Sequence, residues 1–132
     1  MKAAIESELG VIVFDLDDEE IVAVDEGGTL EREEVELELP LVVAASRSGS
    51  TIAAVVDRRP PLVVSHDAGT TWHEAGAGLP AGRAVAVSPE HPDLVLFASE
   101  HRVHLSRDGG RFWESLPLEL TDVRAVAWAE DV

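Results

Sequence analysis

SHDAGTTW, at residues 65–72, returns as SRDGGRFW at residues 106–113. Both copies read S-x-D-x-G-x-x-W. One more step of the same length toward the N-terminus reaches residues 24–31, VDEGGTLE, where Gly28 and Thr29 match and a glutamate replaces the aspartate. The serine and the tryptophan are missing there. We interpret this stretch as a decayed third copy. The chain is therefore predicted to consist of repeats, with a period equal to the number of residues from Ser65 to Ser106.

The residue types of this block suit a tight turn between two strands. In each copy the aspartate can accept hydrogen bonds from backbone N–H groups of the turn, and the glycine can take a positive φ. The serine can add a second bond to the backbone, and the tryptophan can bury its ring against a neighbouring strand. We expect structural roles for Ser65, Asp67, Gly69, Trp72, Ser106, Asp108, Gly110 and Trp113.

The two blocks resemble the Asp-box, also called the BNR repeat, of sialidase-like and related β-propellers. The resemblance implies four-stranded blades, with strands A to D counted from the inside out and the block in the C–D turn. It also implies that the residues of the block are structural. An active sialidase is excluded, because the chain has no tyrosine to act as the nucleophile and lacks the Arg-Ile-Pro element that precedes the boxes in those enzymes.

The rest of the chain reads as all-β. Residues 35–39 alternate between apolar residues and glutamate, the period of a strand with one solvated face. Short apolar and β-branched runs bounded by turn residues predict the other strands. These lie at 11–15, 21–24, 41–45, 52–56, 62–65, 72–73, 83–88, 94–98, 103–106, 112–116 and 123–128.

Grouped into blades, these strands predict a single domain, 1–132, with blade units at about 10–40, 41–82 and 83–119 and a closing strand A at 123–128. The first unit then lacks its strand A. Three blade equivalents fall short of the roughly four to eight blades of typical propellers. We therefore expect a homodimer in which strand exchange completes both first blades and closes a six-bladed ring. An open three-bladed fragment, or pairing with a different half-propeller, is the alternative.

Composition narrows the class of partner. The chain has 26 acidic and 10 basic residues, a formal net charge of −16, which disfavours nucleic acid and anionic membranes as partners. The acidity can serve solubility in a high-salt cytoplasm, or it can attract a basic partner.

There is no cysteine, so a disulfide framework and a thiolate metal site are excluded. No signal peptide or transmembrane run is visible, and we expect a cytoplasmic protein.

The candidate binding face follows from strand direction. In a propeller the B–C and D–A loops share one end, and in the resembling family partners and substrates usually lie there. The residues predicted for this face are Asp17, Asp18, Arg58, Arg59, Arg83, His101, Arg102 and Asp122.

The function that follows is a non-catalytic binding or scaffold module for a protein or peptide. The alternative is a small glycan-binding propeller or a carboxylate-dependent glycoside hydrolase, with Asp17, Asp18 and Asp122 as the candidate acids. Converging carboxylates with exposed aromatic rings would favour a sugar. Convergence of Arg58, Arg59 and Arg102 would favour an anionic or C-terminal carboxylate ligand. No cofactor is expected, and no metal is expected because the histidines lack metal-site spacing.

Overall fold

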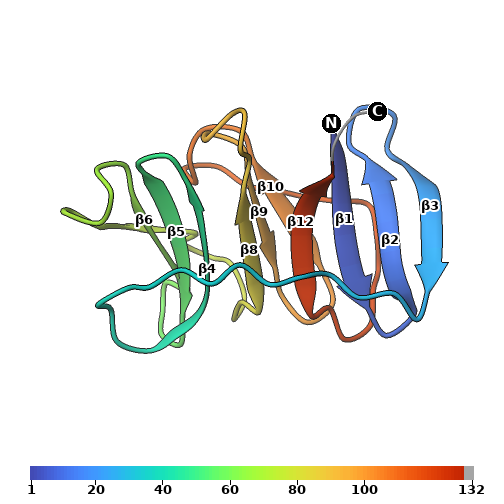
Figure 1. The fold of residues 1–132 in the computed structure, drawn as a ribbon, viewed down its shortest axis with the longest axis horizontal. Helices are drawn as coiled ribbons and strands as arrows, with labels where there is room; N and C mark the ends of the chain where they lie inside the picture. Colours follow the sequence, from blue (N-terminus) through green and yellow to red (C-terminus); the bar gives the residue numbers. More distant parts are fainter. Residues whose placement is uncertain (130–132) are drawn as a thin grey trace.

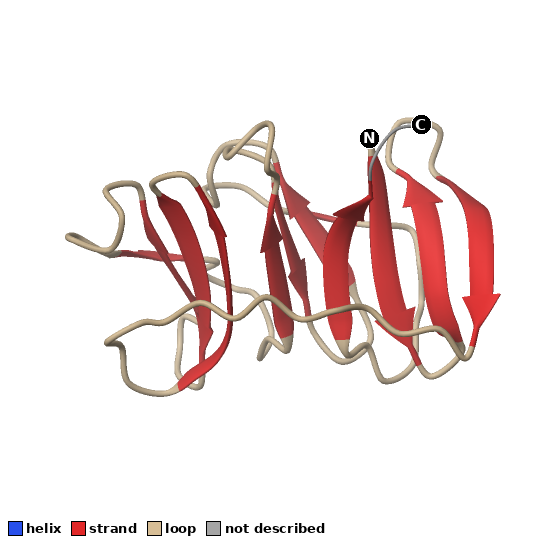
Figure 2. Cartoon of the chain, viewed as in Figure 1, coloured by secondary structure: helices blue, strands red, loops and turns tan. Residues whose placement is uncertain are grey.

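The computed structural model describes residues 1–129, which form twelve strands and no helix. The strands make three four-stranded antiparallel sheets, which we call blades I, II and III (Figures 1 and 2). The all-β class predicted from the sequence is therefore confirmed. Within residues 1–129 there is also no helix long and apolar enough to cross a membrane.

Blades II and III are built from consecutive strands. Blade II has the order β4 (Val42–Ser48), β5 (Thr51–Val56), β6 (Leu62–Ser65) and β7 (His73–Ala75). Blade III has the order β8 (Ala84–Val87), β9 (Val95–Ala98), β10 (Val103–Ser106) and β11 (Glu114–Ser115). All eight strands match those predicted from the repeat, with small differences at their ends.

Blade I is built from both ends of the chain. Its order is β12 (Ala125–Ala129), β1 (Lys2–Ser7), β2 (Gly10–Asp15) and β3 (Glu20–Glu26). β1 was not predicted, so the predicted strands B and C at 11–15 and 21–24 are in fact C and D. The sheet thus spans residues 2–26 and 125–129 rather than 10–40. The physical reason is that Glu6, which interrupts the apolar pattern, is buried with a partner, since its Oε1 accepts a hydrogen bond of 2.8 Å from the Leu30 N–H.

The predicted closing strand is present as β12, and it pairs with β1 of its own chain. Ala4 lies opposite Ala127 and Ile5 opposite Val126 in this antiparallel pair. The Trp128 Nε1–H donates to the Ala86 carbonyl at 3.0 Å, which joins β12 to blade III. Blade I is therefore completed within the chain, and a second chain is not needed to supply its strand A.

Residues 27–41, which we call the strap, connect blade I to blade II. Figure 1 shows the strap running in front of β12 and β8, because blade III lies between the two blades that the strap joins. The prediction of a strand at 35–39 is wrong. Leu37 and Leu39 pack on Ala54, Val56 and Val63 of blade II, while the intervening glutamates are exposed. The alternation reflects extended chain lying on a sheet face without a strand partner.

Two apolar clusters join the blades. One lies between blades I and III and includes Phe14, Ile5 and Leu105. The other lies between blades II and III and includes Val55, Leu62 and Phe97. The inner strands β4, β8 and β12 thus stand side by side, and their N-terminal ends form the D–A end of the molecule (Figure 1).

Candidate functional site

The two repeated turns satisfy their own backbone. In the first, the Ser65 Oγ–H donates to Asp67 Oδ1 at 2.8 Å, and the same Oγ accepts from the Gly69 N–H at 2.8 Å. In the second, Ser106 makes the same two bonds with Asp108 and Gly110, each at 2.8 Å. In each turn the tryptophan Nε1–H donates to the carbonyl of the glycine, and that glycine has a positive φ.

These turns also hold their carboxylates ionised. Hydrogen bonds from the Thr71 hydroxyl and backbone lower the pKa of Asp67 to about 2. The Phe112 N–H, with smaller contributions from Ser106 and Arg111, lowers the pKa of Asp108. Every feature of the two turns therefore serves local structure.

The interpretation of residues 24–31 as a third turn of this kind is wrong. They begin in β3 and run into the strap, whereas the C–D turn of blade I lies at residues 16–19, between β2 and β3. There the Asp15 Oδ1 accepts from the N–H groups of Asp17 and Asp18 at 2.9 and 3.1 Å. A carboxylate at the last residue of β2 thus replaces the serine that ends β6 and β10, and the register of the repeat does not extend into blade I.

The predicted binding face divides into three groups. Arg83, His101, Arg102 and Asp122 all lie in loops at the shared B–C and D–A end. Asp17 and Asp18 lie at the opposite end, because blade I starts one strand earlier than predicted; the Asp17 carboxylate accepts from the Met1 amine at 2.7 Å. Arg58 and Arg59 lie in the B–C loop of blade II, at the predicted end, where they line a separate pocket with Val43, Leu79 and Gly82.

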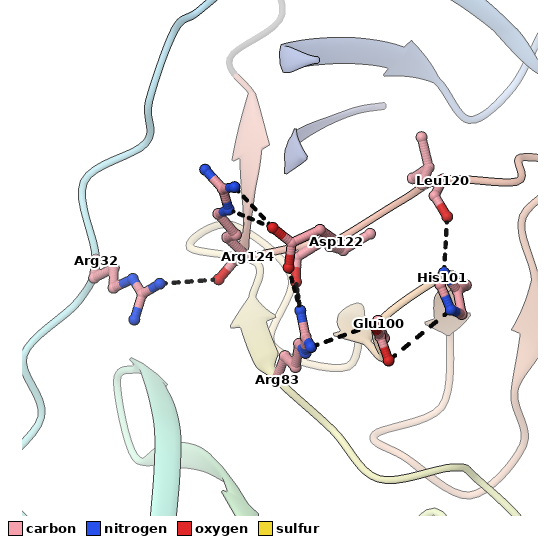
Figure 3. Close-up of polar contacts among 8 residues, drawn as sticks. Arg32, Arg83, Glu100, His101, Leu120, Asp122 and Arg124 are labelled. Carbon is pink, nitrogen blue, oxygen red and sulfur yellow. Dashed lines mark hydrogen bonds and ion pairs between the residues drawn. The ribbon is translucent and has the colours of Figure 1, made fainter. Parts of the chain in front are cut away.

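An ion-pair network organises the group at the shared end (Figure 3). The Arg83 Nη1 lies 2.7 Å from Asp122 Oδ1, and the Arg124 Nη2 lies 2.7 Å from Asp122 Oδ2. The Arg83 Nη2 also lies 3.6 Å from Glu100 Oε1. Hydrogen bonds from Arg124 and then from Arg83 lower the pKa of Asp122. Asp122 therefore stays ionised and locks the two guanidinium groups in place.

The other two predicted residues are held at the edge of this network. His101 Nδ1 lies 3.2 Å from the Leu120 carbonyl, and its Nε2 lies 3.9 Å from Glu100 Oε2. Arg102 Nη2 lies 3.5 Å from Glu119 Oε1, and the side chains of all four residues in these two contacts are exposed.

A pocket of about 120 Å³ lies beside the network, between the strap and the inner strands. Its charged lining consists of Glu31, Arg32, Glu33, Arg83 and Arg124. Its remaining lining residues are alanines and valines of β4, β8 and β12, and none of the described residues that line it is aromatic. The pocket therefore combines guanidinium groups at its rim with a small apolar floor.

The strap is fastened over this pocket by side chains. The Arg32 Nη2 donates to the Arg124 carbonyl at 3.4 Å. The Glu33 carboxylate accepts from the hydroxyl of Ser46 at 2.8 Å and from the Arg47 N–H at 3.1 Å. Ser46 is fully buried, and its Oγ also accepts from the Val87 N–H at 2.8 Å. One buried hydroxyl thus joins the strap, β4 and β8.

Arg32, Glu33 and Ser46 were not among the predicted site residues. Residues 24–31 were assigned to a C–D turn and residues 35–39 to an outer strand, which placed Arg32 far from the central end. One signal was available, because Arg32 is the only basic residue between Lys2 and Arg47 and interrupts a strongly acidic run. Within residues 1–129, no cluster of three or more His, Asp or Glu side chains could hold a metal ion.

No known protein-family profile matches the chain, and no curated protein matches it. The crystal structure of a GH74 enzyme from Niastella koreensis aligns with a TM-score of 0.51 and 22% sequence identity. The alignment covers 61% of this chain and 13% of the enzyme's chain. At this identity the likeness concerns the fold alone, and over the aligned part of the chain it is consistent with a propeller-like fold.

Proposed function

We propose that the chain is a non-catalytic propeller module of the Asp-box type that binds a peptide or protein segment through a carboxylate. The binding site is the pocket between the strap and the inner strands. The repeated turns, with their shared serine, aspartate and tryptophan contacts, support the Asp-box relationship.

The observation that carries this proposal is the position of three arginines around one pocket that has no aromatic lining. A guanidinium fork binds a carboxylate in a bidentate manner. Arg83 and Arg124 are already held in place by Asp122. Arg32 makes a long hydrogen bond to a carbonyl and no ion pair with a described residue, so its charge is available to a ligand. The net negative charge does not prevent this, since salt screens repulsion beyond about 8 Å at physiological ionic strength.

Two observations weigh against the glycoside hydrolase alternative. A general acid needs a raised pKa and a second carboxylate across the sugar. Asp122 instead has a lowered pKa and two arginine partners, and Asp17 and Asp18 lie at the other end of the molecule. A sugar-binding site is also less favoured, because the pocket offers no ring on which a sugar could stack.

A matched pair of peptide libraries tests the proposal. Hexapeptides with a free C-terminal carboxylate should bind, and their amidated counterparts should not, when titrated in 0.15 M salt and followed by calorimetry. Arg32→Gln should weaken binding roughly 10- to 100-fold, because a hydrogen bond to a charged group contributes about 1.5–3 kcal/mol. Arg111→Gln, in the second repeated turn, is the control and should bind normally. Equal binding of amidated peptides, or no effect of Arg32→Gln, would count against the proposal.

We also propose that two chains pair to close a six-bladed ring. Blade count supports this, because three blades fall short of the roughly four to eight of closed propellers. Strand exchange is not part of the proposal. Light scattering on a size-exclusion column at low and high salt should give twice the chain mass of 14.2 kDa. A monomer under both conditions would overturn it.

A further inference from the structure

The outermost strands of the three blades differ sharply in length. β7 has three residues and β11 has two, whereas β3 has seven. Proteins commonly protect the free edge of a sheet by keeping the edge strand very short. Blades II and III follow this rule, and blade I does not.

The long edge strand is also apolar and open. Within residues 1–129, β3 pairs with β2 on one side and ends its sheet, and every residue of β3 is exposed. The large side chains Ile21, Val22 and Val24 are 48%, 45% and 56% exposed. An exposed, apolar edge strand of this length is a ready template for pairing with another strand.

The exposed side chains continue the core of blade I. Ile21 lies opposite Phe14 and Val24 lies opposite Ile12, and both partners belong to the cluster between blades I and III. Ile21 and Val24 therefore extend the apolar face of the blade beyond the part that blade III covers. A strand added to β3 could place its own apolar side chains beside them and lengthen this face.

The charge around β3 indicates which strand it would accept. β3 itself contains Glu20, Asp25 and Glu26, and the turn before it adds three more acidic residues. The segment 1–40 holds fourteen acidic and two basic residues, which is −12 of the net charge of −16. A cross-strand partner of opposite charge stabilises a pair, and a like charge destabilises it.

The same charges disfavour a second copy of this chain at the edge. If two β3 strands paired in antiparallel orientation about Ala23, Glu20 of one would lie opposite Glu26 of the other. Both ends of the pair would then hold facing glutamates. A basic partner meets no such repulsion.

We infer that the free edge of β3 binds an extended, basic segment of a partner protein by strand addition. The segment has alternating β-branched residues in its centre and Lys or Arg at its ends. Backbone hydrogen bonds supply affinity in this mode of recognition, and side chains supply selectivity. This surface lies on the outside of blade I, and the inference does not depend on the carboxylate pocket.

A labelled peptide, Lys-Lys-Val-Thr-Val-Thr-Val-Lys-Lys, is a direct probe. Its fluorescence anisotropy should rise on addition of the protein, and binding should weaken as salt increases. The same peptide with glutamate in place of lysine should not bind. Hydrogen exchange should show new protection of the β3 amides on binding and no protection in β7 or β11.

Backbone pairing is separated from simple charge attraction by a second peptide. A version N-methylated at its central valines and threonines keeps every charge but loses the donors that strand addition needs, so its binding should be abolished. Binding of the methylated peptide at the original affinity would overturn the inference.

Matched charge reversals locate the surface. Glu20→Lys/Glu26→Lys should weaken binding roughly tenfold or more, because it replaces attraction with repulsion at both ends of the added strand. Glu34→Lys/Glu36→Lys makes the same change in net charge on the strap and should change affinity by less than about threefold. Equal effects of the two double variants would overturn the inference. Arg32→Gln should leave binding of the basic peptide unchanged. Failure of the pocket proposal can therefore be distinguished from failure of the strand-addition inference.

Discussion

Blade I and the two repeat blades use different means to hold four strands together. In blades II and III the strands follow one another in the chain, and a serine, an aspartate and a tryptophan secure the C–D turn. In blade I the inner strand comes from the far end of the chain, and Asp15 alone takes the place of the serine. The sequence repeat therefore reflects local turn chemistry. Blade closure is a long-range pairing between β12 and β1, and it produces no repeat in the sequence.

The same contrast extends to the outer edges. The turns of blades II and III that contain the serine, aspartate and tryptophan lead into outer strands of three and two residues. The simpler turn of blade I leads into a strand of seven residues that stays open. The blade without the repeat is therefore the one that ends, within residues 1–129, in a long exposed outer strand.

The largest expected effect tests the long-range closure of blade I. Val126→Asp places a charge at a buried position of β12, against the cluster between blades I and III, and should cost about 3–5 kcal/mol. Because that is a large part of the stability of a small domain, we expect loss of cooperative unfolding in urea. Ala129→Asp, at the less buried end of the same strand, is the matched control. Unfolding of Val126→Asp at the wild-type midpoint would show that β12 does not hold blade I in place.

A middle-sized effect tests the secured turns. Ser65→Ala and Ser106→Ala each remove a buried hydroxyl and leave a glycine N–H without its acceptor, which should lower the free energy of unfolding by about 1–3 kcal/mol. Asp15→Ala in blade I should shift the urea midpoint less, because its turn is solvated. If the three variants are equally destabilised, the turns of the three blades do not differ in the way described.

The smallest expected effect is a pH dependence confined to the secured turns. The folded-state pKa of Asp67, about 2, is below its ordinary value of 3.8. Its stabilising contribution is therefore fully present above about pH 4 and is lost as the pH falls toward 2. The difference in unfolding free energy between wild type and Asp67→Asn should accordingly shrink between pH 4 and pH 2, and Asp108→Asn should show the same sign. A difference that is constant over this range would contradict the role given to the carboxylates.

Much of the fold could be predicted because turn chemistry and strand period are local. The eight strands of blades II and III follow directly from the repeated blocks and the apolar runs between them. β1 was missed because the burial of Glu6 depends on the Leu30 N–H, which no pattern near Glu6 reveals. The strand predicted at 35–39 has the right alternation, but its apolar side chains lie on blade II instead of in a paired strand.

The candidate site could be predicted only in part, because some of its residues depend on local strand order and others on long-range contacts. Six of the predicted residues lie at the predicted end, since they follow from the strand order of blades II and III and from the closing strand: Arg58, Arg59, Arg83, His101, Arg102 and Asp122. Asp17 and Asp18 were placed at the wrong end, because an unrecognised first strand reverses the end at which every later loop of blade I lies. Arg32 was missed because only the path of the strap brings it to Arg124.

Four features could be read from the sequence alone: the all-β class, the two repeat blades, their self-satisfied turns and the acidity of the segment 1–40. These depend on residues close together in the chain, where spacing and residue type specify hydrogen bonds and burial. Three features are visible only in the folded chain: β12 completes blade I of its own chain, the strap crosses to blade II, and Arg32 joins the arginines of the pocket. The physical reason is that these contacts join segments far apart in sequence, and their geometry exists only once the blades have packed.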